Sequence, residues 1–153
     1  MKPPELFPGG RALPPHAYVP GRTARHDPAI FAAYHDSVRE GMAPDDLAQT
    51  AAWRAGWHLI ENGFFWEAHE VLEPVWMQLR PGSEEREFVQ GIIQLANAAL
   101  KREMGRPKAV RRLCAMVERH LTACGDRPEV MGLRLAGVRA CLDRVGAESN
   151  PSG

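Results

Sequence analysis

The chain has 153 residues, of which 44% are hydrophobic, and its 19 basic and 19 acidic residues give a formal net charge of zero. This length is typical of one globular domain with a sizeable hydrophobic core. A neutral balance argues against electrostatic capture of nucleic acid or of an anionic membrane surface, so we expect neither partner. The basic run KAVRR at 108–112 is interpreted as a solvated helix face.

The first 26 residues are expected to form an extended arm, because they are rich in proline and lack helical periodicity. Tyr18 and Val19 give this arm apolar contacts, and its prolines lower the entropy lost on docking. We expect residues 13–26 to pack on the helical body near the motif described below. Three basic side chains of the arm could then meet three acids of the motif: Arg22, Arg25 and His26 with Glu67, Glu70 and Glu73.

Helix signals follow from Asp27 onward, and each predicted helix stops at or near a glycine. The six predicted ranges are 27–41, 43–63, 65–79, 83–105, 107–125 and 128–146. No segment shows the alternating pattern of a strand. The sequence therefore predicts an all-α fold, a compact bundle of about six helices built from antiparallel helical hairpins. Residues 27–146 form the helical domain, and 147–153 are expected to be a frayed tail.

The segment FWEAHEVLEPVW, residues 65–76, combines aromatic side chains with a histidine and acids. On a helical wheel His69 and Glu73 lie at the centre of the aromatic arc and are neighbours at i and i+4. We therefore predict that both are largely buried and either hydrogen-bonded to each other or joined through one neighbouring group. The predicted outer side carries Glu67, Val71, Pro74 and Gln78. Pro74 removes one backbone hydrogen bond and frees the carbonyl of Glu70.

Three interpretations of this polar cluster stay open: a structural network, a binding or catalytic pocket, and a metal site. HEVLE resembles the zinc-protease pattern HExxH, but Glu73 replaces its second histidine. We therefore expect no metal and no cofactor. A second polar stripe, with Gln90 and Gln94, lies on the next predicted helix, where amides could partner a carboxylate or a histidine.

The strings NGFFWEAHEVLEPVW and FVQGIIQLANAAL resemble the domain-of-unknown-function family numbered three hundred and nine, over about residues 47–120. This resemblance implies a small all-helical bacterial or archaeal protein and supplies no activity. It also implies the signature positions Glu67, His69, Glu70, Glu73, Trp76, Gln90 and Gln94. Pro74 departs from the helix-friendly residue that is usual in the family at this point.

The leading functional hypothesis is a helical module whose polar cluster binds a small polar ligand or a protein partner. The candidate binding residues are His69, Glu70, Glu73, Trp66, Trp76, Gln90 and Gln94. The alternative is a hydrolase with His69 as general base, assisted by Glu73 and Glu70; no catalytic residue is assigned beyond this. Three widely spaced cysteines and the lack of an apolar leader predict a cytoplasmic protein. We expect the protein to be either a monomer or a homodimer.

Overall fold

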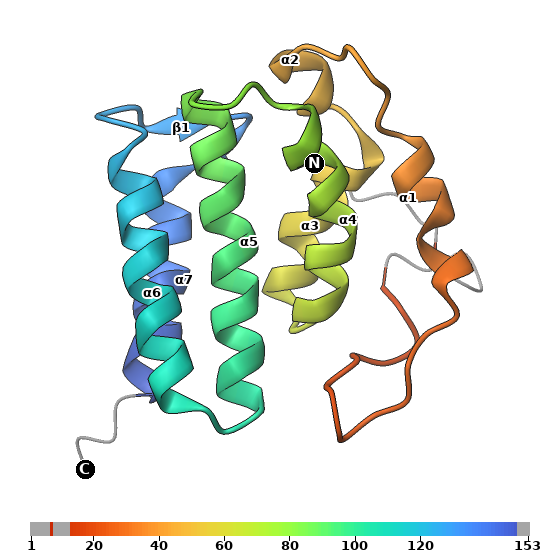
Figure 1. The fold of residues 1–153 in the computed structure, drawn as a ribbon, viewed down its shortest axis with the longest axis vertical. Helices are drawn as coiled ribbons and strands as arrows, with labels where there is room; N and C mark the ends of the chain where they lie inside the picture. The colour runs from red at the N-terminus through yellow and green to blue at the C-terminus, as the bar shows by residue number, and fades with distance from the viewer. Residues whose placement is uncertain (1–6, 8–12, 150–153) are drawn as a thin grey trace. The chain divides into compact units, whose positions relative to one another are not determined.

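The computed structural model describes Phe7 and residues 13–149. The chain divides into two compact units, residues 1–79 and 80–153, so the helical part that the sequence predicted over 27–146 is shared between them. The described residues contain seven α-helices, one 3₁₀-helix and a two-stranded hairpin (Figure 1). The all-α fold class predicted from the sequence is confirmed.

The first unit begins with the arm and continues into short helical segments before two longer helices. Its elements are the 3₁₀-helix η1 (Pro28–Phe31), α1 (Ala32–Asp36), α2 (Pro44–Leu47), α3 (Ala51–Glu61) and α4 (Phe65–Gln78). The single helices predicted over 27–41 and 43–63 are therefore wrong. Ser37 ends α1 by donating its hydroxyl to the carbonyl of Tyr34 at 2.6 Å. Thr50 starts α3 afresh, because its hydroxyl accepts the amide of Trp53 at 3.2 Å.

Helices α3 and α4 form an antiparallel pair in this unit (Figure 1). Their approach is close at Gly56 of α3, where a Cβ would lie 2.2 Å from a methyl carbon of Leu72 on α4. Leu72 is fully buried there, so the glycine provides the space into which the leucine packs.

The second unit is a helical hairpin followed by a third helix. It contains α5 (Glu84–Glu103), α6 (Pro107–Thr122), β1 (Glu129–Val130), β2 (Leu133–Arg134) and α7 (Leu135–Ser149). The predicted start of α5 is confirmed, because the Ser83 hydroxyl accepts the amide of Arg86 at 3.1 Å. The predicted start of α6 at Pro107 is also confirmed.

The helix predicted from Pro128 is wrong in its first residues. Glu129 pairs with Arg134 across a short antiparallel hairpin, and Met131 and Gly132 turn the chain with φ angles of 51° and 80°. Two consecutive residues with positive φ cannot belong to an α-helix, so α7 begins only at Leu135. Helix α7 continues through Ser149, and the rest of the tail predicted at 147–153 lies outside the described residues.

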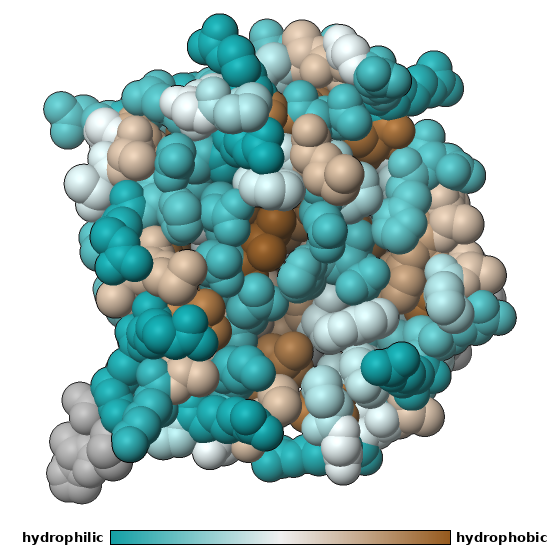
Figure 2. Space-filling view, viewed as in Figure 1, coloured by the Kyte–Doolittle hydropathy of each residue, from teal (hydrophilic) through white to brown (hydrophobic). Residues whose placement is uncertain are grey.

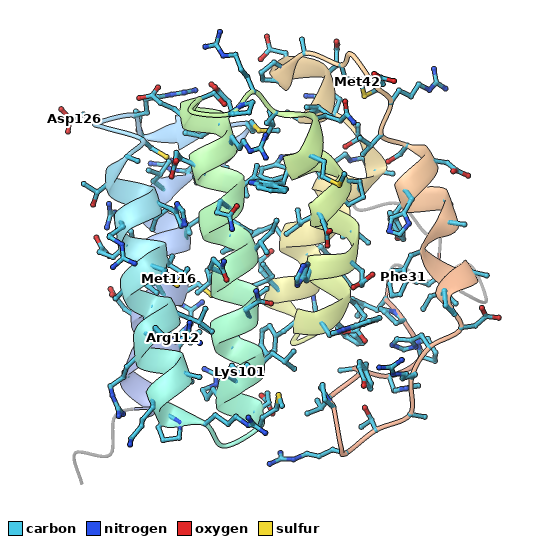
Figure 3. The ribbon with its side chains drawn as sticks, in the orientation of Figure 1. Phe31, Met42, Lys101, Arg112, Met116 and Asp126 are labelled. Atoms are coloured by element: carbon cyan, nitrogen blue, oxygen red, sulfur yellow. The ribbon has the colours of Figure 1, made fainter. Side chains whose placement is uncertain are left out.

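Aliphatic and aromatic side chains form the cores, and polar side chains dominate the face drawn in Figure 2. Phe31 of η1 is 2% exposed and has the arm residue Phe7 against it, with 6.2 Å between ring centroids (Figure 3). In the part of the chain that the structure describes, no helix is both long and apolar enough to cross a membrane.

Candidate functional site

A carboxylate with no solvent exposure anchors the arm to α4. Glu67 is 0% exposed, and its Oε2 accepts the backbone amide of Tyr18 at 2.7 Å and Nε2–H of His26 at 2.6 Å. The side chain of His26 is itself only 2% exposed. The other oxygen, Oε1, is buried without a hydrogen-bond partner among the described residues. A buried carboxylate is costly unless it is hydrogen-bonded, so this contact determines where the arm lies.

Aromatic rings surround this contact. Tyr18 meets Trp66 edge to face at 5.0 Å, and the rings of His16 and His26 lie 4.4 Å apart. The prediction that residues 13–26 dock near the motif is therefore confirmed. Of the predicted basic contacts, His26 reaches Glu67, whereas the Arg25 guanidinium donates to the Tyr18 hydroxyl at 3.4 Å.

The predicted burial of His69 and Glu73 is wrong, although their mutual contact is confirmed. His69 Nε2 lies 3.2 Å from Glu73 Oε2, and the two side chains are 33% and 52% exposed. The buried side of α4 is the aliphatic one, formed by Ala68, Val71, Leu72 and Val75. The aromatic arc pointed to the wrong face, because Trp66 and Trp76 are only half-buried and can border solvent with part of the ring.

The open side of α4 carries a row of side chains at i, i+4 and i+8. His69, Glu73 and Met77 form this row, and Glu70 lies next to it, half-buried. Met77 is 61% exposed and is the only exposed large hydrophobic residue among those that the structure describes. We call His69, Glu70, Glu73 and Met77 the open row of α4.

Pro74 breaks the backbone ladder of α4 as predicted, and a partner replaces the missing donor. His35 of α1 places Nε2 3.0 Å from the carbonyl oxygen of Glu70, the group that Pro74 leaves unpaired. The acceptor is a carbonyl, so the imidazole must donate from Nε2. No pattern in the sequence predicted a role for His35. The only signal in the sequence was the freed carbonyl itself, which requires a donor.

The two glutamines of the candidate cluster lie on α5, in the second unit. Both are half-buried, and Gln94 accepts an amide hydrogen of Asn97 at 3.1 Å through its side-chain oxygen. The opposite face of α5 belongs to the core of this unit, because Phe88, Ile92 and Leu95 are fully buried.

Other polar contacts gather where α5 begins and α6 ends. His120 Nδ1 lies 2.7 Å from Glu87, and Arg127 donates to Glu84 and Glu85. The hydrogen bond from Arg127 lowers the pKa of Glu85. Cys124 is fully buried, and burial raises the pKa of its thiol to about 11, so it remains a neutral thiol and a poor nucleophile.

Metal-binding geometry is limited within the described residues. No three side chains of His, Cys, Asp or Glu converge there as ligands would. The contact between His69 and Glu73 brings together one imidazole and one carboxylate, which is fewer than the ligands of a tetrahedral zinc site.

Comparisons with known proteins agree with the motif. Residues 53–113 match the model of the family described as a domain of unknown function, DUF309. A conserved hypothetical protein from Thermus thermophilus with a crystal structure is 34% identical, with a TM-score of 0.53 over 61% of this chain and 95% of that one. No curated protein matches the chain. The matched residues include all of α4 and α5, with the motif on which the resemblance rested, and the chain belongs to the DUF309 family.

Proposed function

We propose that this protein is a helical binding module that recognises a protein partner through the open row of α4. The observation that carries the proposal is the exposure of Met77 at 61%, one helical turn beyond the half-exposed Glu73. A methionine side chain is flexible and polarizable, so when exposed it adapts well to a partner's surface.

The shape of the row favours a protein over a small ligand. Small-molecule sites are concave and enclose most of the ligand, whereas Glu73 and Met77 are both more than half exposed on the outside of a helix. A helix exterior with apolar and charged side chains in register fits into a groove of another protein. Glu70 and Glu73 add negative charge, so the groove should pair an apolar floor with a basic side chain.

Trp66 and Trp76 border the row and remain candidate contacts, since both keep part of the side chain accessible. Gln90 and Gln94 remain candidate binding residues of the second unit by themselves, because their half-buried side-chain amides can both donate and accept hydrogen bonds.

A photo-crosslinking residue at position 77 tests the proposal in cells. We expect a discrete covalent adduct at position 77 that disappears when Glu73→Arg is added. The matched control carries the crosslinker at Glu118, which is 53% exposed on α6. Identical adducts at both positions, or none at position 77, would show that the row is not a recognition surface.

The 3.2 Å contact between His69 and Glu73 favours a second candidate, a hydrolase with His69 as general base and Glu70 as an acid or electrostatic group. The Glu73 carboxylate could orient the imidazole of His69, which is partly accessible to solvent. The test compares His69→Gln with His120→Gln on chromogenic ester and phosphodiester substrates. His120 is the control because it also contacts a glutamate. Loss of turnover only in His69→Gln would establish the enzyme, and no turnover in wild type would exclude it for these substrates.

We also place the protein in the bacterial cytoplasm, as a monomer or a homodimer. None of the three cysteines forms a disulfide within the described residues, which fits a reducing compartment. Fractionation of cells that express the tagged protein tests the location, and light scattering of the purified protein tests the oligomeric state.

A further inference from the structure

The formal neutrality of the chain conceals two units of opposite charge. Residues 1–79 contain six basic and ten acidic residues, and residues 80–153 contain 13 basic and nine acidic ones. The net charges are therefore −4 and +4. The neutrality of the whole chain therefore does not exclude a polyanionic partner for the second unit taken alone.

The positive charge is concentrated where α5 joins α6. Six basic residues and one acid lie between positions 101 and 112, and we call the six the basic end: Lys101, Arg102, Arg106, Lys108, Arg111 and Arg112. The last four are exposed. Figure 3 labels Lys101 and Arg112, which come from the two helices at the end where they connect.

The part of the basic end at the start of α6 is electrostatically unfavourable for folding. Within the described part of the chain, Arg106, Lys108, Arg111 and Arg112 have no ion-pair partner. Lys108 and Arg112 repel each other at i and i+4, and the first turn of α6 has no acid to complement the helix dipole. The α5 helix, by contrast, begins with Glu84, Glu85 and Glu87. Sequence features that oppose stability without compensation often mark a functional surface.

We propose that the basic end binds the phosphate backbone of duplex nucleic acid. The surrounding surface excludes several other modes of binding. Phe88 is the only Phe, Tyr or Trp residue of the second unit, and it is fully buried, so the surface of this unit offers none of these three large rings for stacking of unpaired bases. The described residues of this unit also expose no large apolar side chain that could enter a membrane or form the centre of a protein interface.

Binding through phosphates alone depends steeply on salt and weakly on sequence. The test is fluorescence anisotropy of the full chain with a labelled DNA duplex of two helical turns, across about 50–200 mM salt. We expect a dissociation constant of about 1–100 µM near physiological salt, and similar affinity for duplexes of unrelated sequence.

The variant K108Q/R111Q/R112Q removes three charges of the basic end. If each cation meets one phosphate, its affinity should fall at least about tenfold at low salt, and the slope of log K against log salt should become less negative by about 2.7. The control R22Q/R39Q/R134Q removes three exposed arginines from elsewhere and should change neither quantity. Because the first variant also removes repulsion, its thermal midpoint should rise, which separates lost binding from misfolding.

Several outcomes would overturn the proposal. One is that the wild type shows no salt-dependent binding to the duplex, and another is that the two triple variants lose equal affinity. A third is that the affinity for polyglutamate equals that for the duplex, which would indicate an acidic protein partner. Binding to phosphatidylserine vesicles without binding to the duplex would identify an anionic membrane instead.

Discussion

The two sides of α4 each carry a histidine–glutamate contact, but only one of them is covered. On the covered side His26 and Glu67 are 2% and 0% exposed, and the contact is 2.6 Å long. On the open side His69 and Glu73 are 33% and 52% exposed and lie 3.2 Å apart. The same pair of residue types therefore anchors a segment in one place and stays partly exposed to solvent in the other. Solvent exposure, more than residue type, separates the two roles.

Removing the covered imidazole should have the largest effect. His26→Ala leaves the Glu67 carboxylate buried with one fewer donor, and breaking a buried pair costs about 3–5 kcal/mol. We expect the lower end, about 3 kcal/mol, because release of the arm can rehydrate the carboxylate. Urea unfolding of His26→Ala beside His69→Ala measures the contrast. Equal losses in the two variants would remove the distinction between the sides.

The second expected effect concerns the thiol of Cys124, whose pKa is shifted mainly by burial. The pKa of the Cys124 thiol is raised from 9.0 to about 11, so the folded state favours the protonated form. Stability from this group is complete below about pH 9 and is lost as the pH rises through about 11. The free energy of unfolding should fall by about 2 kcal/mol across that window in wild type, relative to Cys124→Ala. A constant difference between the two proteins over the same range would contradict this.

The third effect tests the donor that replaces the amide missing at Pro74. His35→Leu removes the hydrogen bond to the Glu70 carbonyl and should cost about 1 kcal/mol, since water can reach this exposed position. In a Pro74→Ala background the backbone amide can bond to that carbonyl, so His35→Leu should then cost almost nothing. A double-mutant cycle by thermal unfolding measures the coupling free energy between His35 and Pro74. If the effects of the two mutations are simply additive, His35 does not replace the donor that Pro74 lacks.

The smallest effect belongs to the open side. Glu73→Gln should change the free energy of unfolding by about 0–1 kcal/mol, because an exposed pair gains little. Adding salt should reduce even this difference. If Glu73→Gln lowers the free energy of unfolding as much as His26→Ala does, the open row stabilises the fold. This result would contradict the proposal that the row is free to bind a partner.

Local signals in the sequence predicted much of the fold. Ser83 and Pro107 specify the starts of α5 and α6 through capping and a fixed φ, which act within one turn. Pro74 also acts within one turn: it has no N–H to donate, so the carbonyl of Glu70 is left free. The helix breaks after Ser37 and before Thr50 were not predicted. Helix propensity alone would continue the helix at both places, but the side chains of Ser37 and Thr50 form hydrogen bonds with the backbone that compete with it.

The orientation of α4 could not be predicted in the same way. The positions of Trp66 and Trp76 led to the prediction that the side of α4 with His69 is buried, whereas the aliphatic residues determine the buried side. Glu67 was placed on the outer side because a wheel contains only one helix and omits the segment that covers it. Its burial depends on Tyr18 and His26, which lie more than 40 residues earlier in the chain.

The hydrogen bond from the Tyr18 amide to Glu67 makes the arm's attachment observable at a single site. This amide lies outside every helix and strand, yet its acceptor has no solvent exposure. Its exchange with deuterium should therefore be slow, like that of a core helix, although the backbone around it is irregular. The exchange rate would report how often the arm detaches while both helical units remain folded, and it would do so in the unmodified protein.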